Sequence, residues 1–477
     1  MSNERAETQS GMREPIERPR CAGRLTRRRF LELGTAGAVG VALASALSAC
    51  GGAAPPAPQP APTAAGAQPA AQAGPGGFSG GGSLKMLVNA HFVPAYDAWL
   101  EKWASDWGAK NKVTVEVDHL QTADLTAKSA AEVASGAGHD VIRLARSGDA
   151  NLYDKYLLDV GDVAKPIGEA NGGWVQPVTE SIAVVNGVWK VLPDFFTSFD
   201  GMYRKDLFDA AGLKAPETWD DVLKAGTIFK AQGHQIGISI NQKSTDSLNS
   251  WTALLWSFGA STVAADSKTV TINSPETRQA LEFAVELYNK AMTSEVLSWD
   301  ESSNNQLLAA GTASWIHIPI SALRTIEKDK PDLAENIWLT PTPAGPKGRF
   351  YTSSGFSYGI MSWTQNAAAA KAFFVDYFND FAAAVKASEG YNQPFLANWR
   401  KKPMPILGES PKYSVDQDAA DYYRASGYPG KPTQAAGEVE ANWIVPLMVA
   451  RAVGDNNLDG AMEWAEQKIQ AIYAKYK

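Results

Sequence analysis

Short apolar runs alternate with amphipathic segments from residue 84 onward, and this pattern restricts the fold more than any other feature of the chain. Residues 84–88 form one apolar run, and residues 113–117 alternate apolar and polar side chains as a half-buried strand does. Between them, residues 96–107 place large aromatic side chains three and four positions apart, as on one face of a helix. A second helical stretch follows, and then a strand over residues 140–144. This succession predicts an α/β domain with a doubly wound sheet.

The same alternation recurs downstream and predicts a second α/β unit. The chain beyond residue 83 is long enough for two domains of about 150 residues each. It contains no period that indicates a solenoid or a propeller. We expect strands over residues 236–240 and 313–318, and helices over residues 248–258, 275–292, 443–450 and 458–476.

A long segment before these elements has the composition of a spacer. Residues 51–83 are almost wholly Ala, Pro, Gly and Gln, with Phe78 as the one large apolar residue. Such a segment cannot bury a core, and its prolines favour extended chain. We therefore expect residues 50–83 to be a flexible linker that holds a globular body away from an attachment point.

Two export signals precede this linker. Residues 26–31 contain a twin-arginine run, and residues 47–50 form a lipid-attachment box whose last residue is Cys50. The uncharged stretch between them is short and rich in glycine, which indicates a cleaved signal peptide over residues 1–49; a retained anchor helix is the alternative. Cys50 then becomes the lipidated first residue. Because the chain has two cysteines and Cys21 lies upstream of the cleavage, no disulfide is expected in the mature protein.

The charge of the chain argues against nucleic acid as a partner. Residues 1–49 hold eight Arg and five Glu, and subtracting that +3 from the total of −7 leaves −10 for the rest. An acidic body without a basic stripe lacks the groups that neutralise phosphates. Attachment to a membrane must likewise come from lipid on Cys50, and several acyl chains are needed for a stable anchor.

No constellation typical of an enzyme is present in the sequence. The five histidines are scattered without the spacing of metal ligands, and neither a nucleophile elbow nor a Walker loop occurs. The pair Asp220 and Asp221 is better interpreted as the start of a helix than as a catalytic dyad. We expect no catalytic residues, no metal and no cofactor.

A resemblance to a known family is carried by residues 136–142, 192–213, 216–221, 307–313 and 341–346. These stretches resemble the extracellular solute-binding proteins of family 1, which serve ABC importers and include the maltose-binding type. The resemblance covers nearly all of residues 84–477 and does not depend on one motif.

This resemblance implies a type II periplasmic-binding-protein fold, in which two α/β lobes are joined by hinge crossovers and grip a solute between them. The crossovers are expected near residues 195–199 and 351–357. The N-terminal lobe is then expected to comprise residues 84–197 plus 357–412. The C-terminal lobe is expected to comprise residues 198–356 plus 413–477.

Aromatic residues suggest the class of solute. The chain has fifteen Trp and is 10% aromatic, and the apolar faces of pyranose rings stack on such side chains. Many of these rings are expected in the core, Trp99 and Trp103 among them. Trp443 lies in a stretch that resembles the one with a sugar-stacking tryptophan in maltose-binding relatives. The candidates for contact with the solute are Phe195, Phe196, Trp251, Trp315, His317, Tyr351 and Trp443.

Polar candidates follow the predicted strands. Open α/β sheets bind ligands beyond the carboxyl ends of their strands, which favours the residues after 88 and after 144. The acidic residues that surround the sugar in maltose-type relatives are replaced here, so maltodextrin itself is not the expected solute. The candidates are Asn89, His91, Phe92, Arg146, Asp246 and Asn249.

The sequence as a whole predicts a substrate-binding lipoprotein that captures a sugar or oligosaccharide and delivers it to an ABC permease. It is expected outside the cytoplasm, on the bacterial cell membrane, at the cell surface or in the periplasm. Two alternatives remain open. A polyamine or other small organic cation would require carboxylates beside aromatic rings, and a tethered sensing module would hand its closed form to a sensor instead of a permease.

Overall fold

The apolar runs form strands of two separate sheets in the computed structural model, which describes residues 78–353 and 355–476. The larger sheet has the strand order β12-β6-β11-β3-β1-β2, and the smaller has the order β10-β7-β9-β8. The predicted signal peptide 1–49, Cys50 and most of the predicted linker 50–83 lie outside the described residues. The strands of the larger sheet are β1 (Ser83–Asn89), β2 (Thr114–Leu120), β3 (Val141–Leu144), β6 (Leu192–Phe196), β11 (Gly355–Ile360) and β12 (Gln393–Pro394).

The smaller sheet lies in the second α/β unit and mixes strand directions. Strand β7 runs antiparallel to β9 and β10, while β8 runs parallel to β9. Strand β8 is shorter than expected, because the chain leaves the sheet after Gly237 and Ile240 instead donates its backbone N–H to Val296. The strands are β7 (Asp200–Arg204), β8 (Gln235–Gly237), β9 (Ala313–Ile318) and β10 (Ile337–Thr340), and a separate ribbon pairs β4 (Val184–Val185) with β5 (Val188–Trp189).

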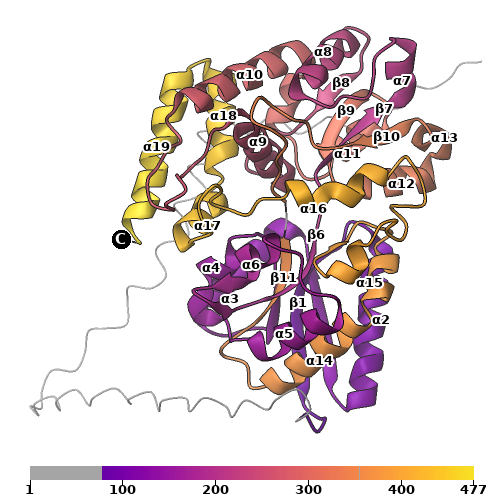
Figure 1. Ribbon diagram of the computed structural model, residues 1–477, viewed down its shortest axis with the longest axis vertical. Helices are drawn as coiled ribbons and strands as arrows, with labels where there is room; N and C mark the ends of the chain where they lie inside the picture. The colour runs from indigo at the N-terminus through magenta and orange to yellow at the C-terminus, as the bar shows by residue number, and fades with distance from the viewer. Residues whose placement is uncertain (1–77, 354, 477) are drawn as a thin grey trace, which may run out of the picture. The chain divides into compact units, whose positions relative to one another are not determined.

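Helices flank both sheets, as Figure 1 shows. Helix α3 contacts β1, β2 and β3, while α2 contacts β2 and α14 contacts β1. None of the described helices is long and apolar enough to cross a membrane. The helices in the first half of the chain are α2 (Pro94–Asn111), α3 (Thr122–Ser135), α4 (Asp149–Leu152), α5 (Gly161–Ala170), α6 (Val178–Ala183), α7 (Lys205–Ala210) and α8 (Trp219–Lys230).

Most of the helices that cover the smaller sheet come from the second half of the chain. Two other helices of that half, α14 and α15, pack with the elements of the larger sheet. Helices α8, α9 and α11 contact β9, and α18 and α19 pack on α10. The bounds are α9 (Thr245–Phe258), α10 (Pro275–Ala291), α11 (Ser303–Ala309), α12 (Ser321–Asp329), α13 (Pro331–Ala334), α14 (Ala367–Asn379), α15 (Phe381–Ala387), α16 (Ala419–Tyr422), α17 (Gln434–Ala441), α18 (Ile444–Asp455) and α19 (Leu458–Ala474).

The interpretation of Asp220 and Asp221 as a helix start is confirmed at α8. Thr218 accepts a hydrogen bond from the backbone N–H of Asp221 at 3.1 Å, and the Asp221 carboxylate accepts one from the backbone N–H of Thr218 at 3.0 Å. This reciprocal capping box satisfies two donors that the first turn of a helix otherwise leaves free. Asp221 therefore has a structural role.

The chain passes between the two sheets at well-defined places. The first passage lies between Phe196, which ends β6, and Asp200, which begins β7. The second lies between Thr340 and Gly355, and a third follows β12, because α17–α19 belong with the helices around the smaller sheet. The fold is thus the two-lobed α/β architecture with crossovers. The lobe boundaries at 197/198, 356/357 and 412/413 stay predictions.

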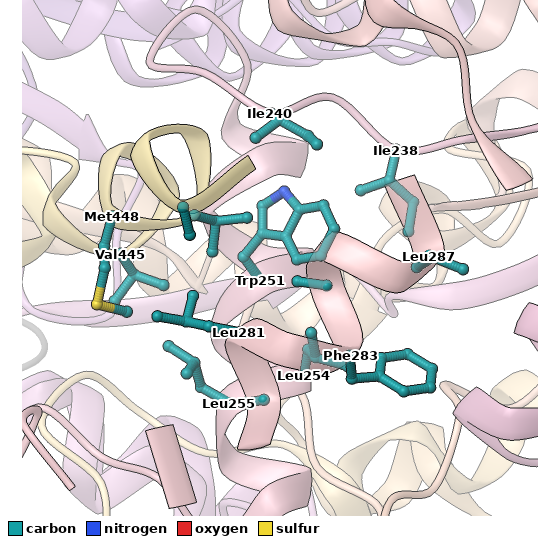
Figure 2. Packing of buried hydrophobic residues seen from close by; sticks show 14 of the residues in the cluster. Ile238, Ile240, Trp251, Leu254, Leu255, Leu281, Phe283, Leu287, Val445 and Met448 are labelled. Carbon is teal, nitrogen blue, oxygen red and sulfur yellow. The ribbon is translucent and has the colours of Figure 1, made fainter. Parts of the chain in front are cut away.

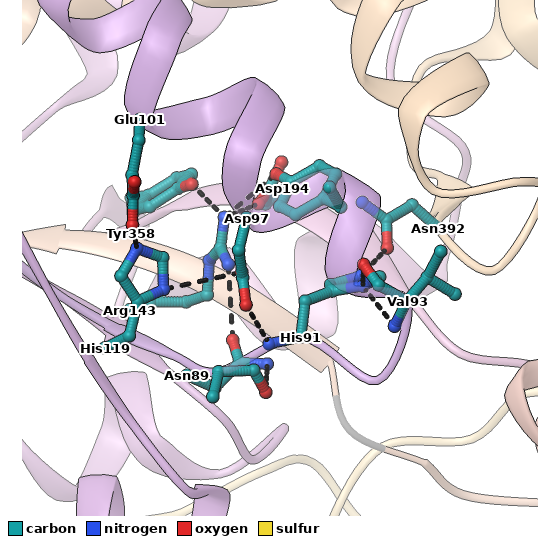
Figure 3. A network of polar contacts seen from close by, with 12 residues as sticks. Asn89, His91, Val93, Asp97, Glu101, His119, Arg143, Asp194, Tyr358 and Asn392 are labelled. Atoms are coloured by element: carbon teal, nitrogen blue, oxygen red, sulfur yellow. Dashed lines mark hydrogen bonds and ion pairs between the residues drawn. The ribbon is translucent and has the colours of Figure 1, made fainter.

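A buried charged network fixes the middle of the larger sheet (Figure 3). Arg143 on β3 is fully buried and forms an ion pair of 2.9 Å with the equally buried Asp194 on β6. The guanidinium also donates to Asn89 Oδ1 at 3.2 Å, to the Tyr96 hydroxyl at 3.0 Å and to the Tyr358 hydroxyl. Tyr358 lies on β11, between the two charged strands. The pair therefore joins three neighbouring strands from within the core.

We expect Asp194→Ala to lower the free energy of unfolding by about 3–5 kcal/mol, because it leaves the Arg143 charge buried without its partner. The matched control is Asp106→Ala, which removes one side of the exposed Lys102–Asp106 pair and should cost less than about 1 kcal/mol. Chemical denaturation monitored by circular dichroism measures both. Equal effects of the two changes would contradict a central role for the buried pair.

Candidate functional site

A cavity of about 570 Å³ lies between elements of the two lobes, and we call it the cleft cavity. One wall comes from α3 and from the segment that follows β3. The other comes from α9, the segment before it and the turn between α17 and α18. The residues that line it are Thr122, Ala123, Thr126, Ala127, Ala130, Val133, Ala145, Arg146, Ser147, Leu152, Tyr153, Gln242, Thr245, Leu248, Asn249, Ser353, Glu440, Ala441 and Trp443.

Arg146 enters the cleft cavity just beyond the carboxyl end of β3, where open α/β sheets bind ligands. Its guanidinium donates from Nε to Asp149 Oδ1 at 2.9 Å, and its backbone N–H donates to Asp149 Oδ2. The ion pair keeps the arginine in one orientation, because both partners are largely buried. Arg146 therefore presents its hydrogen-bond donors in a fixed orientation, unlike a mobile charged side chain at the surface.

Trp443 reaches the cleft cavity from the opposite lobe through an unusual backbone conformation. Its φ of 56° and ψ of 33° lie in the left-handed region at the start of α18. That region costs a residue with a β-carbon about 1–2 kcal/mol. Strain of this kind persists where the surrounding structure enforces it, and it concentrates at functional sites. The partly buried indole lines the cavity opposite the apolar residues of α3.

Glu440, three residues before Trp443, has one carboxyl oxygen without a partner in the described part of the chain. Its Oε2 atom is buried and has no hydrogen-bond partner among the described residues. Burial raises the pKa of the Glu440 carboxyl to about 7, against the opposing influence of Arg146. A buried acceptor without a partner is costly, so this atom is available to a hydroxyl or ammonium group of a bound molecule.

A much smaller cavity adjoins the cleft cavity and shares Thr122 and Thr245 with it. We call it the adjoining cavity; its free volume is about 20 Å³. Asp246 and Glu301 line it from the lobe of the smaller sheet, and Phe92 and Tyr391 line it from the other lobe. The two cavities together extend the site toward the crossovers.

A third cavity, of about 680 Å³, is larger than the cleft cavity but is a weaker candidate. It lies on the other side of α17 and is lined by Lys155, Lys268, Tyr473 and Tyr476 among others. No indole among the described residues lines it, and its buried polar atoms without a partner, Asn151 Nδ2 and the Tyr473 hydroxyl, belong to neutral groups. Volume alone therefore does not decide the site, and convergent polar groups favour the cleft cavity.

Two main-chain segments meet beside residues that line the cleft cavity. Gly148, which precedes α4, and Gly437, within α17, approach so closely that a β-carbon on Gly148 would lie 2.8 Å from Gly437 Cα. Nearby, the backbone N–H of Ser426 donates to Ser147 Oγ at 2.9 Å. Both contacts join segments on opposite sides of the cleft. The two lobes therefore meet here through the main chain.

The structure brings some of the predicted binding residues to the cavities and leaves the others in the core. Arg146, Asn249 and Trp443 line the cleft cavity, and Phe92 and Asp246 line the adjoining cavity. The remaining candidates are at most 6% exposed and line neither cavity: Asn89, His91, Phe195, Phe196, Trp251, Trp315, His317 and Tyr351.

Asn89 and His91 follow β1 as expected but turn into the network of the larger sheet (Figure 3). Asn89 Oδ1 accepts a hydrogen bond from Arg143. His91 places Nε2 2.8 Å from Asn392 Oδ1, and its Nδ1 accepts from the backbone N–H of Val93. Burial lowers the pKa of the His91 imidazole to about 4, so the ring is neutral at pH 7. Both side chains have internal partners and stay in the core.

Trp251 and Trp315 pack in the core of the smaller sheet. Helix α9 is buried on nearly all sides, so Trp251 lies among Leu254, Leu281 and Met448 (Figure 2) and donates to Ser239 O at 2.8 Å. Trp315 on β9 stacks on His317 with ring centroids 5.5 Å apart. Both indoles therefore pack against other side chains inside the protein, and neither offers a face on which a solute could stack.

The residues predicted at the crossovers hold the crossovers together. The His317 imidazole lies within 3.1 Å of Phe199 O and 3.0 Å of Thr342 Oγ1, one from each of two crossovers. Phe195 packs on Phe356 and Phe196 packs on Tyr423, and the Tyr351 backbone pairs with Tyr422 and Arg424. These contacts stabilise the junction between the lobes.

Sequence reasoning missed the carboxyl groups of Glu440 and Glu301 and the polar side chains of Gln242 and Tyr153. Glu440 had one usable signal, since it lies one helical turn before Trp443. The others had none. The places of Gln242 and Glu301 depend on the packing of α9 and α11 against the other lobe, and that of Tyr153 depends on the packing of the segment after α4. No group of three or more His, Cys, Asp or Glu residues that could hold a metal occurs in the described part of the chain.

We expect Glu440→Gln to stabilise the ligand-free protein at high pH. The Glu440 carboxyl has a pKa of 4.5 in the unfolded chain and about 7 when folded, so its ionisation increasingly destabilises the folded state as pH rises from 4.5 to about 7. The free energy of unfolding of the variant should exceed that of the wild type by about 1–3 kcal/mol at pH 8, and the difference should vanish near pH 4. Urea denaturation at the two pH values measures it; a pH-independent loss of stability would contradict this role.

The chain is similar in sequence to known binding proteins. The family model described as bacterial extracellular solute-binding protein matches residues 89–387. A probable ABC transporter-binding protein of Deinococcus radiodurans is 25% identical over 237 residues, which cover 46% of this chain and 56% of the relative. A putative binding protein of Brucella abortus is 23% identical and covers 56% of this chain and 64% of the relative. The chain thus matches less than two thirds of the length of these relatives.

Solved structures share the fold over most of the chain. A solute-binding protein of Thermotoga lettingae bound to α-D-tagatose superposes with a TM-score of 0.70 at 18% identity, covering 82% of this chain and 99% of that one. A sugar transporter protein of Arthrobacter chlorophenolicus with bound laminaribiose gives 0.72 at 15% identity, covering 82% and 99%. Maltose-bound MalE3 of T. maritima gives 0.69 at 19% identity, covering 82% and 100%. With its two-lobed fold and its interlobe cavity, this chain belongs to the family of bacterial extracellular solute-binding proteins.

Proposed function

We propose that this protein captures a sugar or polyol between its lobes and delivers it to an ABC permease. The cleft cavity carries the proposal, because it combines one indole with planar polar groups. Trp443 offers an apolar face, while Arg146, Gln242 and Asn249 offer donors and Glu440 offers an acceptor. The volume of about 570 Å³ lies within the usual range of small-molecule sites.

The solved relatives support the same class of solute. Three of them are described with tagatose, laminaribiose and maltose. Others are described with ribitol and with D-mannitol. The shared feature of these molecules is a dense set of hydroxyl groups, which matches a cavity rich in hydrogen-bonding side chains. The proposed role is binding and release, with no chemical step.

The proposed route to the permease rests on the two-lobed fold. A solute that contacts both walls of the cleft cavity favours the closed arrangement, because only that arrangement brings both sets of contacts together. The closed lobes then present one continuous surface to the membrane subunits. The lobe division at 84–197 plus 357–412 and 198–356 plus 413–477 is part of this proposal.

We further propose that lipid on Cys50 tethers the protein outside the cytoplasm. The lipid-attachment box at residues 47–50 supports this, and the twin-arginine run at residues 26–31 supports export in a folded state. A body without disulfides that is stabilised by its core alone is compatible with folding before export. The linker 50–83 would then give the lobes reach toward the permease.

The test of the binding role is a thermal-shift series with mono- and oligosaccharides, polyols, amino acids and metal ions. One class of polyhydroxylated solute should raise the melting temperature saturably, since ligand at 100 times its Kd stabilises by about 2.7 kcal/mol. Trp443→Ala should then weaken that binding by about 1–3 kcal/mol, because it removes the indole face. Isothermal titration measures the loss.

The matched control for this series is Trp464→Ala on α19, which packs against Arg451 and lines neither cavity. It should leave the affinity for the solute unchanged. An unchanged affinity in Trp443→Ala, together with a lowered melting temperature, would assign that indole to packing alone. A saturable response only to amino acids or metal ions would contradict the proposed class of solute.

Cys50→Ala should release the protein from membranes into the soluble fraction, because it removes the site of lipid attachment. Fractionation of cells followed by immunoblotting measures the distribution. Binding of solute by the released protein should be unchanged, since the change lies outside residues 84–477. Continued membrane association would contradict the lipid anchor and favour a retained helix over residues 33–49.

A further inference from the structure

The two cavities of the cleft carry more negative than positive side chains. Three carboxyl groups line them, from Glu440, Asp246 and Glu301. The one cationic side chain that lines either cavity is Arg146, and Asp149 already pairs with it at 2.9 Å. Among the described residues, no Lys, Arg or His forms an ion pair with any of the three carboxyl groups. In the part of the chain that the structure describes, the site therefore has a surplus of acidic over basic side chains.

The hydrogen bonds of these carboxyl groups do not remove that surplus. Asp246 Oδ2 accepts from the Asn304 amide at 2.8 Å, and Glu301 accepts from the Thr245 backbone N–H at 2.8 Å and from the Ser244 hydroxyl at 3.1 Å. All of these donors are neutral. Glu440 Oε2 lacks even a neutral partner. A carboxylate taken out of water without a counter-charge is costly, and burial accordingly raises the pKa of all three carboxyl groups. A cation supplied from outside the chain would stabilise their ionised forms.

Aromatic rings accompany the carboxyl groups in both cavities. Trp443 and Tyr153 line the cleft cavity with Glu440, and Phe92 and Tyr391 line the adjoining cavity with Asp246 and Glu301. The face of an aromatic ring attracts a cation, and more strongly where water is excluded. A hydroxyl group of a solute would interact with the carboxyl oxygens alone. An ammonium group would interact both with the carboxyl groups and with the faces of the aromatic rings.

We propose that the solute is a polyhydroxylated molecule that carries a protonated amino group, such as an amino sugar. This inference rests on the proposed function and narrows its class of solute. The ammonium group is held by Glu440 beside Trp443, and the hydroxyl groups occupy the donors Arg146, Gln242 and Asn249. Asp246 and Glu301, whose pKa values burial raises, supply further carboxyl groups toward the adjoining cavity.

The experiment compares solutes that share a skeleton and differ in one substituent. Isothermal titration of the full chain at pH 7.5 uses the β-1,4-linked dimers of glucosamine, N-acetylglucosamine and glucose, and then galactosamine, mannosamine and their neutral counterparts. Putrescine serves as an amine without hydroxyl groups. At least one amino sugar should bind ten times or more tighter than its acetylated and its neutral counterparts.

The outcomes separate the inference from the proposed function. A neutral sugar or polyol that binds as tightly as its amino counterpart would overturn the charge inference and leave the proposed function standing. Binding of putrescine without binding of any sugar would overturn both, because the hydroxyl groups would then have no role. Absence of binding by every member of the series would likewise contradict both.

A pair of variants tests the assigned residue. Glu440→Gln should weaken binding of the amino sugar tenfold or more, change binding of the neutral sugar by less than threefold, and not lower the melting temperature. The control Glu438→Gln lies on the same helix, pairs with Lys475 at the surface, and should change neither affinity. An equal loss for both sugars in Glu440→Gln would overturn the assignment. Asp246→Asn, in the adjoining cavity, provides a second variant with the same expected selectivity if Glu440→Gln does not fold.

Discussion

The ion pair between Arg143 and Asp194 is the interaction on which the rest of the larger sheet depends. It spans β11 from β3 to β6 and holds the Tyr358 hydroxyl between them. Two charges buried this deeply need further hydrogen bonds besides their mutual attraction, and the tyrosine hydroxyls and Asn89 supply them, although Arg143 Nε has no partner among the described residues. The carboxyl end of β3 is thereby fixed, and Arg146 leaves it at a defined angle toward the cleft. The geometry of the site thus begins inside the sheet.

Buried charged side chains occur in two different arrangements in this protein. In the larger sheet the opposite charges of Arg143 and Asp194 form an ion pair, whereas no ion pair with Glu440 occurs among the described residues. The first arrangement stabilises the folded state, and the second costs free energy in the absence of a ligand. Binding proteins tolerate such a cost where a ligand removes it, because the recovered energy then contributes to affinity and selectivity.

Much of the fold could be predicted from periodicity and from the resemblance, because long amphipathic segments have few alternatives. Helices α2 and α10 and strands β1 and β9 are examples. The site was harder to predict. Arg146 was found from its place after a strand, and Trp443 from its place in a family-like stretch. Trp251 and His317 were equally plausible candidates by residue type, but both lie in the core. An aromatic or imidazole side chain can satisfy itself internally, and its direction depends on which neighbours surround its helix or strand.

The close approach of Gly148 and Gly437 has a consequence for how near the two lobes can come to each other. Where side chains separate two surfaces, rotamer changes adjust the spacing, but two backbones in contact have no adjustable layer between them. The separation of the lobes at that end of the cleft is therefore a property of the chain path and not of the guest. A bound solute, whatever its size, cannot draw the two lobes closer together at this contact.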